Sequence, residues 1–224
     1  MIRITGDTHG DLNRINYAEN YKNLPLGEGD TLIICGDFGF IFDGSKLEKE
    51  KLDLLAEKPY TVCFIDGNHE NFDLLESYPT VNFHGGIAHR IRENIYHLMR
   101  GEIYEFEGKS VFSMGGAYST DRFMRELHES YWENELPSDA EYKTALDNLE
   151  SHGMEIDIIL THTAPTVEVV SLGHTPHPHE WVLTEFLDKV KYGVKYKQWC
   201  FGHLHTDAEL SGGMKSLYFE CEDI

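Results

Sequence analysis

Six short apolar runs recur along the chain of 224 residues, and most of them stop at a turn built from Gly, Asp, Asn or His. The runs are rich in β-branched side chains and only a few residues long, which favours strands over helix fragments. They are apolar nearly throughout, so we expect strands buried on both faces, as in a layered α/β domain. The predicted strands are Ile2–Thr5, Thr31–Cys35, Thr61–Ile65, Val111–Met114, Ile156–Thr161 and Gln198–Phe201.

Helices are predicted between these strands. Two Ser-x-x-Glu patterns, starting at Ser45 and Ser138, read as capping boxes that open helices. A third segment begins at Glu180 and carries its apolar residues on one helical face, ending before Gly193. The predicted helices are residues 46–58, 139–152 and 180–191.

The middle of the chain is less regular. Residues 82–116 alternate loosely and predict antiparallel strands, for instance 103–107 and 110–114 joined by a turn at Glu107-Gly108. Residues 117–137 show neither helical nor strand periodicity, and a long loop of this kind is usually functional. We expect it to be an active-site loop or lid, in which Tyr131 and Trp132 either cover the site or are simply buried.

The composition argues against several classes of protein, among them membrane-spanning proteins and proteins that bind extended nucleic acid. Nineteen Lys and Arg against 39 Asp and Glu give a formal net charge of −20, which opposes binding to extended nucleic acid or to anionic membranes. No apolar run approaches the roughly 18 residues of a membrane span, and Arg3 interrupts the first run, so no signal peptide is expected. Four widely spaced cysteines without a C-x-x-C pair predict free thiols and a cytoplasmic protein. With no linker or repeat, residues 1–224 are expected to form a single domain.

Five polar motifs follow directly after predicted strands. In open α/β sheets ligands gather outside the carboxyl ends of the strands, and glycine allows the sharp turn and close approach needed there. Taken singly, each motif has an ordinary explanation, such as a Gly-Asp turn or a structural histidine. Together they predict one shared site. The motifs are Gly6-Asp7-Thr8-His9-Gly10, Gly36-Asp37, Gly67-Asn68-His69-Glu70, Thr161-His162-Thr163 and Gly202-His203-Leu204-His205.

The order of these motifs resembles that of the calcineurin-like metallophosphoesterases, which is D-x-H, G-D, G-N-H-D/E, H and G-H-x-H. The match spans residues 6–205. The resemblance implies an α/β fold, a four-layer sandwich of two mixed β-sheets flanked by α-helices. It also implies a dinuclear metal centre that hydrolyses phosphate esters.

The resemblance further implies two sets of metal ligands that share one carboxylate. The first set is Asp7, His9, Asp37 and His205, and the second is Asp37, Asn68, His162 and His203. Such mixed carboxylate, amide and imidazole ligands suit two divalent ions, with Mn²⁺ expected and Fe, Ni²⁺ or Zn²⁺ as alternatives. Two ions roughly 3.5–4 Å apart can activate water and clamp a phosphoryl group. His69 belongs to neither set and is expected to protonate the leaving oxygen or stabilise its charge.

Two subfamilies of this family can be compared with the chain motif by motif. The second motif continues as Phe38-Gly39-Phe40, so it lacks the second Asp and the Arg found in phosphoprotein phosphatases of the serine/threonine type. Another subfamily has Cys in place of the catalytic His, whereas this chain keeps His69. The sequence therefore disfavours a protein phosphatase and keeps the group that assists the leaving oxygen.

Contacts to substrate are expected from the segment after the fourth predicted strand. Gly115-Gly116-Ala117-Tyr118-Ser119 and the arginines after it resemble a segment of small bacterial and phage members of the superfamily. Tyr118, Arg122 and Arg125 are the candidate substrate residues, although a solvated loop arginine is the more ordinary interpretation of either arginine. The proline-broken run His174–His179 predicts a surface loop that could border the metals, rather than a third metal site.

Three functions remain open at this stage. The first is a dinuclear phosphoesterase acting on a small phosphate monoester or diester. The second is a nuclease or cyclic-nucleotide phosphodiesterase of the same fold, and the third a non-catalytic interaction module. All the ligand positions are present, which favours an enzyme.

Overall fold

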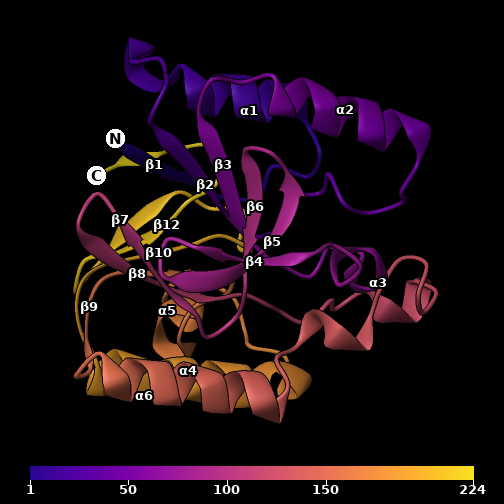
Figure 1. Cartoon of the computed structure of the whole chain (residues 1–224). Coiled ribbons are helices and arrows are strands. Elements are labelled where there is room, and N and C mark those ends of the chain that lie inside the picture. The colour runs from indigo at the N-terminus through magenta and orange to yellow at the C-terminus, as the bar shows by residue number, and fades with distance from the viewer.

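The computed structural model describes residues 1–224, and its centre consists of two packed β-sheets (Figure 1). The first sheet has the strand order β13-β1-β2-β3-β6-β5-β4, in which the pairs from β1 to β6 are parallel and the pairs β13-β1, β6-β5 and β5-β4 are antiparallel. Its strands are β1 (Ile2–Thr5), β2 (Thr31–Cys35), β3 (Thr61–Ile65), β4 (Thr80–Phe83), β5 (Gly86–Arg92), β6 (Ile95–Leu98) and β13 (Glu222–Asp223).

The second sheet has the order β11-β12-β10-β9-β8-β7, with parallel pairs from β12 to β8 and antiparallel strands at both edges. Its strands are β7 (Ile103–Phe106), β8 (Lys109–Met114), β9 (Glu155–Thr161), β10 (Lys195–Phe201), β11 (Ala208–Leu210) and β12 (Met214–Ser216). Both sheets are therefore mixed, as the resemblance implied.

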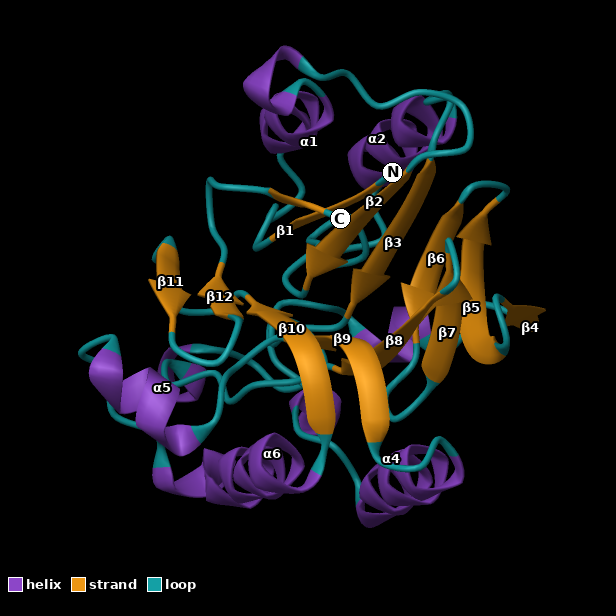
Figure 2. Ribbon diagram, turned by 90° about the vertical axis from the view of Figure 1, so that its left-hand side faces the viewer, coloured by secondary structure: helices purple, strands orange, loops and turns teal.

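Helices cover the outer faces of the two sheets (Figure 2). One layer holds α1 (Leu12–Glu19) and α2 (Lys46–Ala56), and the opposite layer holds α4 (Asp139–Ser151), α5 (Thr166–Ser171) and α6 (Trp181–Gly193), while α3 (Phe72–Leu75) is a single turn. The Ser45 and Ser138 side chains cap α2 and α4, but the full capping box forms only at α4, because the Glu48 carboxylate accepts from backbone N–H groups of residues 42–44 instead. The four-layer α/β sandwich is confirmed.

The near-continuous apolarity of the strands has a direct structural cause. In β2, Ile33 and Cys35 belong to the core between the sheets, whereas Leu32 and Ile34 belong to the core beneath α1 and α2. Since side chains alternate across a strand, a strand covered on both sides must be apolar at every position. The four cysteines are buried and unpaired, which agrees with the prediction of free thiols.

The structure adds elements that the sequence did not reveal. Helix α1 fully buries only Ile15 and Ala18, with Leu12 partly buried beside them, so its apolar stripe is too short to detect, although Asp11 caps its first turn. The predicted starts of α2 and α4 are confirmed, and the other ends of the three predicted helices differ from the observed ends by one or two residues. None of the helices is both long and apolar enough to cross a membrane.

Residues 117–137 form a long loop with short 3₁₀ turns at Arg122–Met124 and Glu133–Glu135. Of the two alternatives for Trp132, burial is the one observed. Its ring packs edge-on against Phe42, and its indole N–H donates to Asp73 at 2.8 Å. The loop is thus anchored to the body of the protein at this point.

Candidate metal centre

The five polar motifs meet where the two sheets come together. They follow the carboxyl ends of β1, β2 and β3 in the first sheet and of β9 and β10 in the second, and the strands pair in parallel within each sheet. Turns that are nearly 200 residues apart in sequence therefore present their side chains to one place. This is the arrangement that the sequence predicted from the positions of the motifs.

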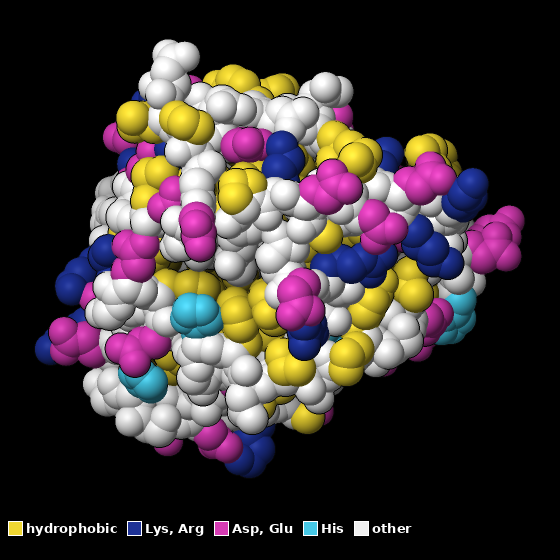
Figure 3. Space-filling model, turned by 45° about the horizontal axis from the view of Figure 1, so that its top comes forward, with side chains coloured by type: hydrophobic (Ala, Val, Ile, Leu, Met, Phe, Trp, Pro, Cys, Tyr) yellow, Lys and Arg dark blue, Asp and Glu magenta, His cyan; other side chains and the backbone are white.

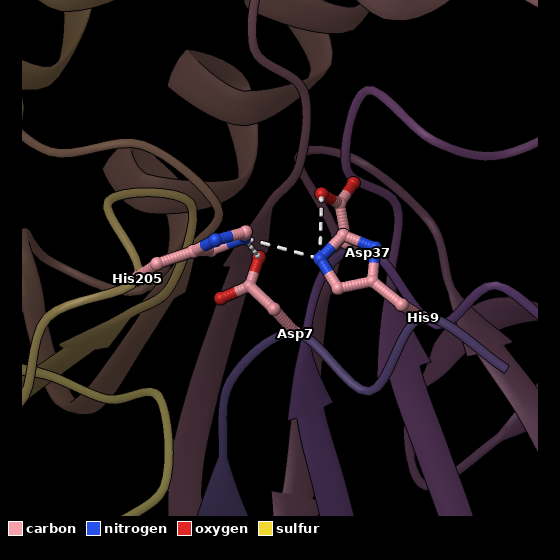
Figure 4. Close-up of side chains that lie close together, drawn as sticks. All are labelled: Asp7, His9, Asp37 and His205. Carbon is pink, nitrogen blue, oxygen red and sulfur yellow. Dashed lines mark hydrogen bonds and ion pairs between the residues drawn. The ribbon is translucent and has the colours of Figure 1, made fainter. Parts of the chain in front are cut away.

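Four side chains of the first ligand set converge closely (Figure 4). One ligand atom from each of Asp7, His9, Asp37 and His205 lies within 4.8 Å of the others. The Nε2 atoms of His9 and His205 are 3.1 Å apart, and Nε2 of His9 is 3.8 Å from Oδ2 of Asp37. Two buried carboxylates and two imidazoles directed at one point match the ligand chemistry of a divalent transition-metal ion.

The second set lies on the other side of Asp37. His162 donates its Nδ1–H to the carbonyl of Cys35 at 2.7 Å, so its other ring nitrogen, Nε2, is the one available to a metal ion. That Nε2 atom lies 3.3 Å from Oδ1 of Asp37 and 3.2 Å from Oδ1 of Asn68. The His203 ring is next to it, 4.9 Å from the His162 ring between centroids. Asp37 thus faces both sets, as a bridging ligand must.

Glycines in these turns make the close approach of the side chains possible. Gly36 has φ +86°, and a Cβ there would lie 2.1 Å from Nδ1 of His162. A Cβ on Gly67 would lie 2.2 Å from Oδ1 of Asp37. Any other residue at either position would displace a proposed ligand, which explains why glycine precedes the ligand in these motifs.

Backbone groups hold the two carboxylates in place. The N–H groups of Asn68 and His69 donate to Oδ1 of Asp37 at 3.0 and 2.9 Å, and the N–H of His203 donates to Asp7. Glu70, to which the sequence assigned no role, is fully buried and accepts from the backbone of Phe38 and Gly67. It ties the second motif to the third. In the sequence, only the position of Glu70 in the G-N-H-D/E pattern could have indicated this role.

Burial and mutual charge shift the titration of the centre. Burial raises the pKa of Asp7 to about 8 and lowers the pKa values of His203 and His9 to about 3 and 4. For Asp37, burial is outweighed by the His162 charge, so the pKa lies below the usual range, and for His162 burial is outweighed by Asp37, which raises its pKa to about 10. The two buried carboxylates repel one another, and divalent ions bound between them would supply the opposite charge.

His69 lies beside the first set without entering it. Its ring packs edge-on against the His9 ring at 5.4 Å between centroids, and burial lowers its pKa. The Nη1 and Nη2 atoms of Arg125 are 3.2 and 3.3 Å from its two ring nitrogens. This position, next to the ligands but outside both sets, fits a group that acts on the substrate.

The three candidate substrate residues are placed differently. Tyr118 and Arg125 line a cavity of about 380 Å³ together with Asn68, His69 and His203. Arg122 does not line that cavity, because its Nε and Nη2 donate to the buried Glu135 at 3.1 and 2.8 Å and its guanidinium covers the Tyr118 ring. The charge of Arg122 is thus already neutralised within the loop.

The His174–His179 loop borders the same cavity. His174 and His177 line it, and the His177 ring stacks on Tyr118 at 4.3 Å between centroids. Glu180, immediately after this loop, is buried in the wall and accepts from the backbone N–H of Tyr118. The loop therefore shapes the space beside the metal ligands, as its position after the fourth motif suggested.

Comparison with known proteins gives the family. The sequence profile described as calcineurin-like phosphoesterase matches residues 1–207. The chain is also similar to a protein of Drosophila pseudoobscura pseudoobscura named lariat debranching enzyme, with 28% identity over 186 residues, or 74% of this chain. That stretch covers 33% of the fly protein, so the chain spans about a third of that relative's length. The chain therefore belongs to the calcineurin-like phosphoesterase family of metal-dependent phosphoester hydrolases.

Proposed function

We propose that this protein hydrolyses small phosphodiesters. The observation that carries the proposal is the position of His69, which lines two neighbouring cavities. The first, which we term the Lys51 cavity, has about 260 Å³ and is lined by His9, Phe42, Leu47 and Lys51 among others. The second, the Arg125 cavity, is the one of about 380 Å³ described above. A phosphoryl group held at the ligand sets would have space for one ester substituent on each side.

The charges in the two cavities support small, largely uncharged substituents. Each cavity has a single cationic side chain, and carboxylates accompany it: Asp43 and Glu48 beside Lys51, and Asp121 and Glu180 beside Arg125. A second phosphate in either cavity would meet these carboxylates. On the face above α1 and α2, basic and acidic side chains are interspersed (Figure 3), which agrees with a net charge of −20 in disfavouring long nucleic acids.

Different residues of the centre would bind the ions, donate a proton and orient the ester. When bound, two divalent ions supply Lewis-acid activation of water and neutralise phosphoryl charge. Asp7, His9, Asp37 and His205 would hold one ion, and Asp37, Asn68, His162 and His203 the other. Oxygen and nitrogen ligands without thiolate support Mn²⁺ as the working ion. His69 donates a proton to the leaving oxygen, and Arg125 is close enough to it to orient the ester.

Removal of the ions should abolish turnover and also lower thermal stability. Ions that bind only the folded site stabilise it by mass action, by about 2.7 kcal/mol when the free ion is 100 times its Kd. Chelated and dialysed protein should therefore melt at a lower temperature than protein with Mn²⁺ added back, as measured by differential scanning calorimetry. Full activity of the metal-free protein would contradict the dinuclear mechanism.

A substrate series tests the preference for diesters. With Mn²⁺ present, bis(p-nitrophenyl) phosphate should be hydrolysed with at least a tenfold higher kcat/KM than p-nitrophenyl phosphate, a difference of about 1.4 kcal/mol. The series also includes cyclic AMP and a short single-stranded DNA, and each of Mn²⁺, Ni²⁺ and Zn²⁺ in turn. Faster hydrolysis of the monoester would overturn the diester assignment, and faster hydrolysis of DNA would favour the nuclease alternative.

A further inference from the structure

His205 is a proposed ligand with little around it to fix its orientation. Its side chain is 48% exposed, whereas the two carboxylates it works with are buried. Its backbone lies in the left-handed region, with φ +47°. An exposed imidazole can rotate among several rotamers, so a metal site that depends on it needs a neighbouring group that favours one of them.

The ring of Tyr218 is that neighbour. It stacks nearly parallel on the His205 ring, with 4.5 Å between centroids and 15° between planes. Nε2 of His205 is then 3.1 Å from Nε2 of His9 and 3.9 Å from Oδ1 of Asp7. The face of the imidazole is covered by Tyr218 while its ligand nitrogen is directed at the other ligands of the first set.

Two further residues hold Tyr218 itself. The Asp207 carboxylate accepts the backbone N–H groups of Tyr218, Phe219 and Glu220 at 2.6, 3.0 and 2.9 Å. From α1, the Arg14 guanidinium lies 4.8 Å from the Tyr218 ring and 4.1 Å from the Phe219 ring, and it donates to the Tyr218 carbonyl. The turn that carries Tyr218 is therefore fixed from two sides.

The contacts of the Arg14 guanidinium indicate what this side chain does. Its Nε and Nη1 are buried without a hydrogen-bond partner, so the aromatic faces and the Tyr218 carbonyl are its contacts here. Burying guanidinium donors unpaired is unfavourable, and the cation–π contacts offset part of that cost. The arrangement is consistent with a support whose purpose is to keep the Tyr218 ring in position.

We propose that Tyr218 is a positioning residue for the first metal ion. Its ring, held by Asp207 and Arg14, keeps the His205 imidazole in the orientation that completes the site with Asp7, His9 and Asp37. The inference rests on the proposed function only in that His205 is taken as a metal ligand. Tyr218 does not face the second ligand set, so its removal should affect one ion and spare the other.

The test is a Mn²⁺ titration of chelated full-length protein by isothermal titration calorimetry, with metal content as a second measure. Wild type should bind two ions. Tyr218→Ala should weaken one of them by about 10–100-fold, the usual effect of removing a group that orients a ligand, and leave the other unchanged. Tyr218→Phe keeps the ring and should retain both affinities. Tyr192→Ala is the matched control, because Tyr192 is an exposed aromatic residue near the end of α6 and contacts neither Arg14 nor Tyr218.

The outcomes separate this inference from the assignment of the centre. If wild type binds no Mn²⁺, Ni²⁺ or Zn²⁺, both fail. If wild type binds two ions and Tyr218→Ala binds them equally well, only the role of Tyr218 is overturned. The same holds if Tyr218→Ala lowers the melting temperature of the metal-free protein and weakens both ions equally, because that is a structural effect. Asp207→Asn keeps the ring and loosens its turn, so it should give a smaller loss at the same single site.

Discussion

Replacing Asp37 with Asn should remove both metal ions and nearly all hydrolysis. Asp37 is the side chain that faces both ligand sets, with one oxygen 3.8 Å from Nε2 of His9 and the other 3.3 Å from Nε2 of His162. The amide would remove a full negative charge and present an N–H₂ donor where an acceptor is required. The loss of Lewis-acid stabilisation is worth several kcal/mol, so kcat/KM should fall by on the order of 10³-fold or more.

Metal analysis and kinetics with excess Mn²⁺ measure the effect. The matched control is Asp53→Asn, which changes an exposed carboxylate on α2 that pairs with Arg92 and should change neither metal content nor rate. Because Asp37 also accepts two backbone N–H groups, a melting curve is needed to show that the variant is folded. Retention of two ions by folded Asp37→Asn would rule out the bridging assignment.

Replacing His69 with Asn or Ala should leave the metal content intact and slow the chemical step. The His69 ring belongs to neither ligand set, but it packs on His9 and lines both cavities. Loss of a positioned general acid should lower the rate by roughly 10²–10⁴-fold for alkyl esters. The loss should be much smaller for p-nitrophenyl esters, because p-nitrophenolate leaves almost without protonation.

A series of aryl and alkyl phosphodiesters, measured on wild type and on the His69 variants, checks this expectation. His152→Asn, an exposed histidine at the end of α4, is the control and should behave as wild type. If His69→Ala lost metal as completely as Asp37→Asn, the ligand assignment would be mistaken. If it lost neither metal nor rate on alkyl esters, His69 would not be the acid.

The strands and the residue types at their ends could be predicted because local sequence determines them. The β-branched and apolar side chains of a run such as Thr61–Ile65 favour a buried strand, and the glycine that follows favours a sharp turn. A capping box can also be predicted from local sequence, since its two residues, Ser138 and Glu141, are only three positions apart. Helix α1 and the strands β4, β5 and β6 lacked so clear a pattern, because each is only partly buried or very short.

The loop 117–137 shows what local sequence does not decide. Arg122 and Arg125 are three residues apart and equally plausible as phosphate contacts by sequence. The fold pairs Arg122 with the buried Glu135, whereas Arg125 pairs with the exposed Asp121 and lies beside His69. The reason is the chain reversal after Arg122, which depends on where Glu135 and Trp132 are buried and not on the residues next to either arginine.

By itself the sequence therefore determined the layered α/β class, the five motifs and, through their resemblance to a family, the residues that would hold two ions. The tertiary structure alone decided that His69 lies between two cavities, that Glu70 ties two motifs together and that Tyr218 packs on His205. The physical reason is the distance along the sequence between the residues that make each feature. Secondary structure and turn chemistry depend on contacts within a few residues, whereas these three features join parts of the chain that approach one another only when both sheets have packed.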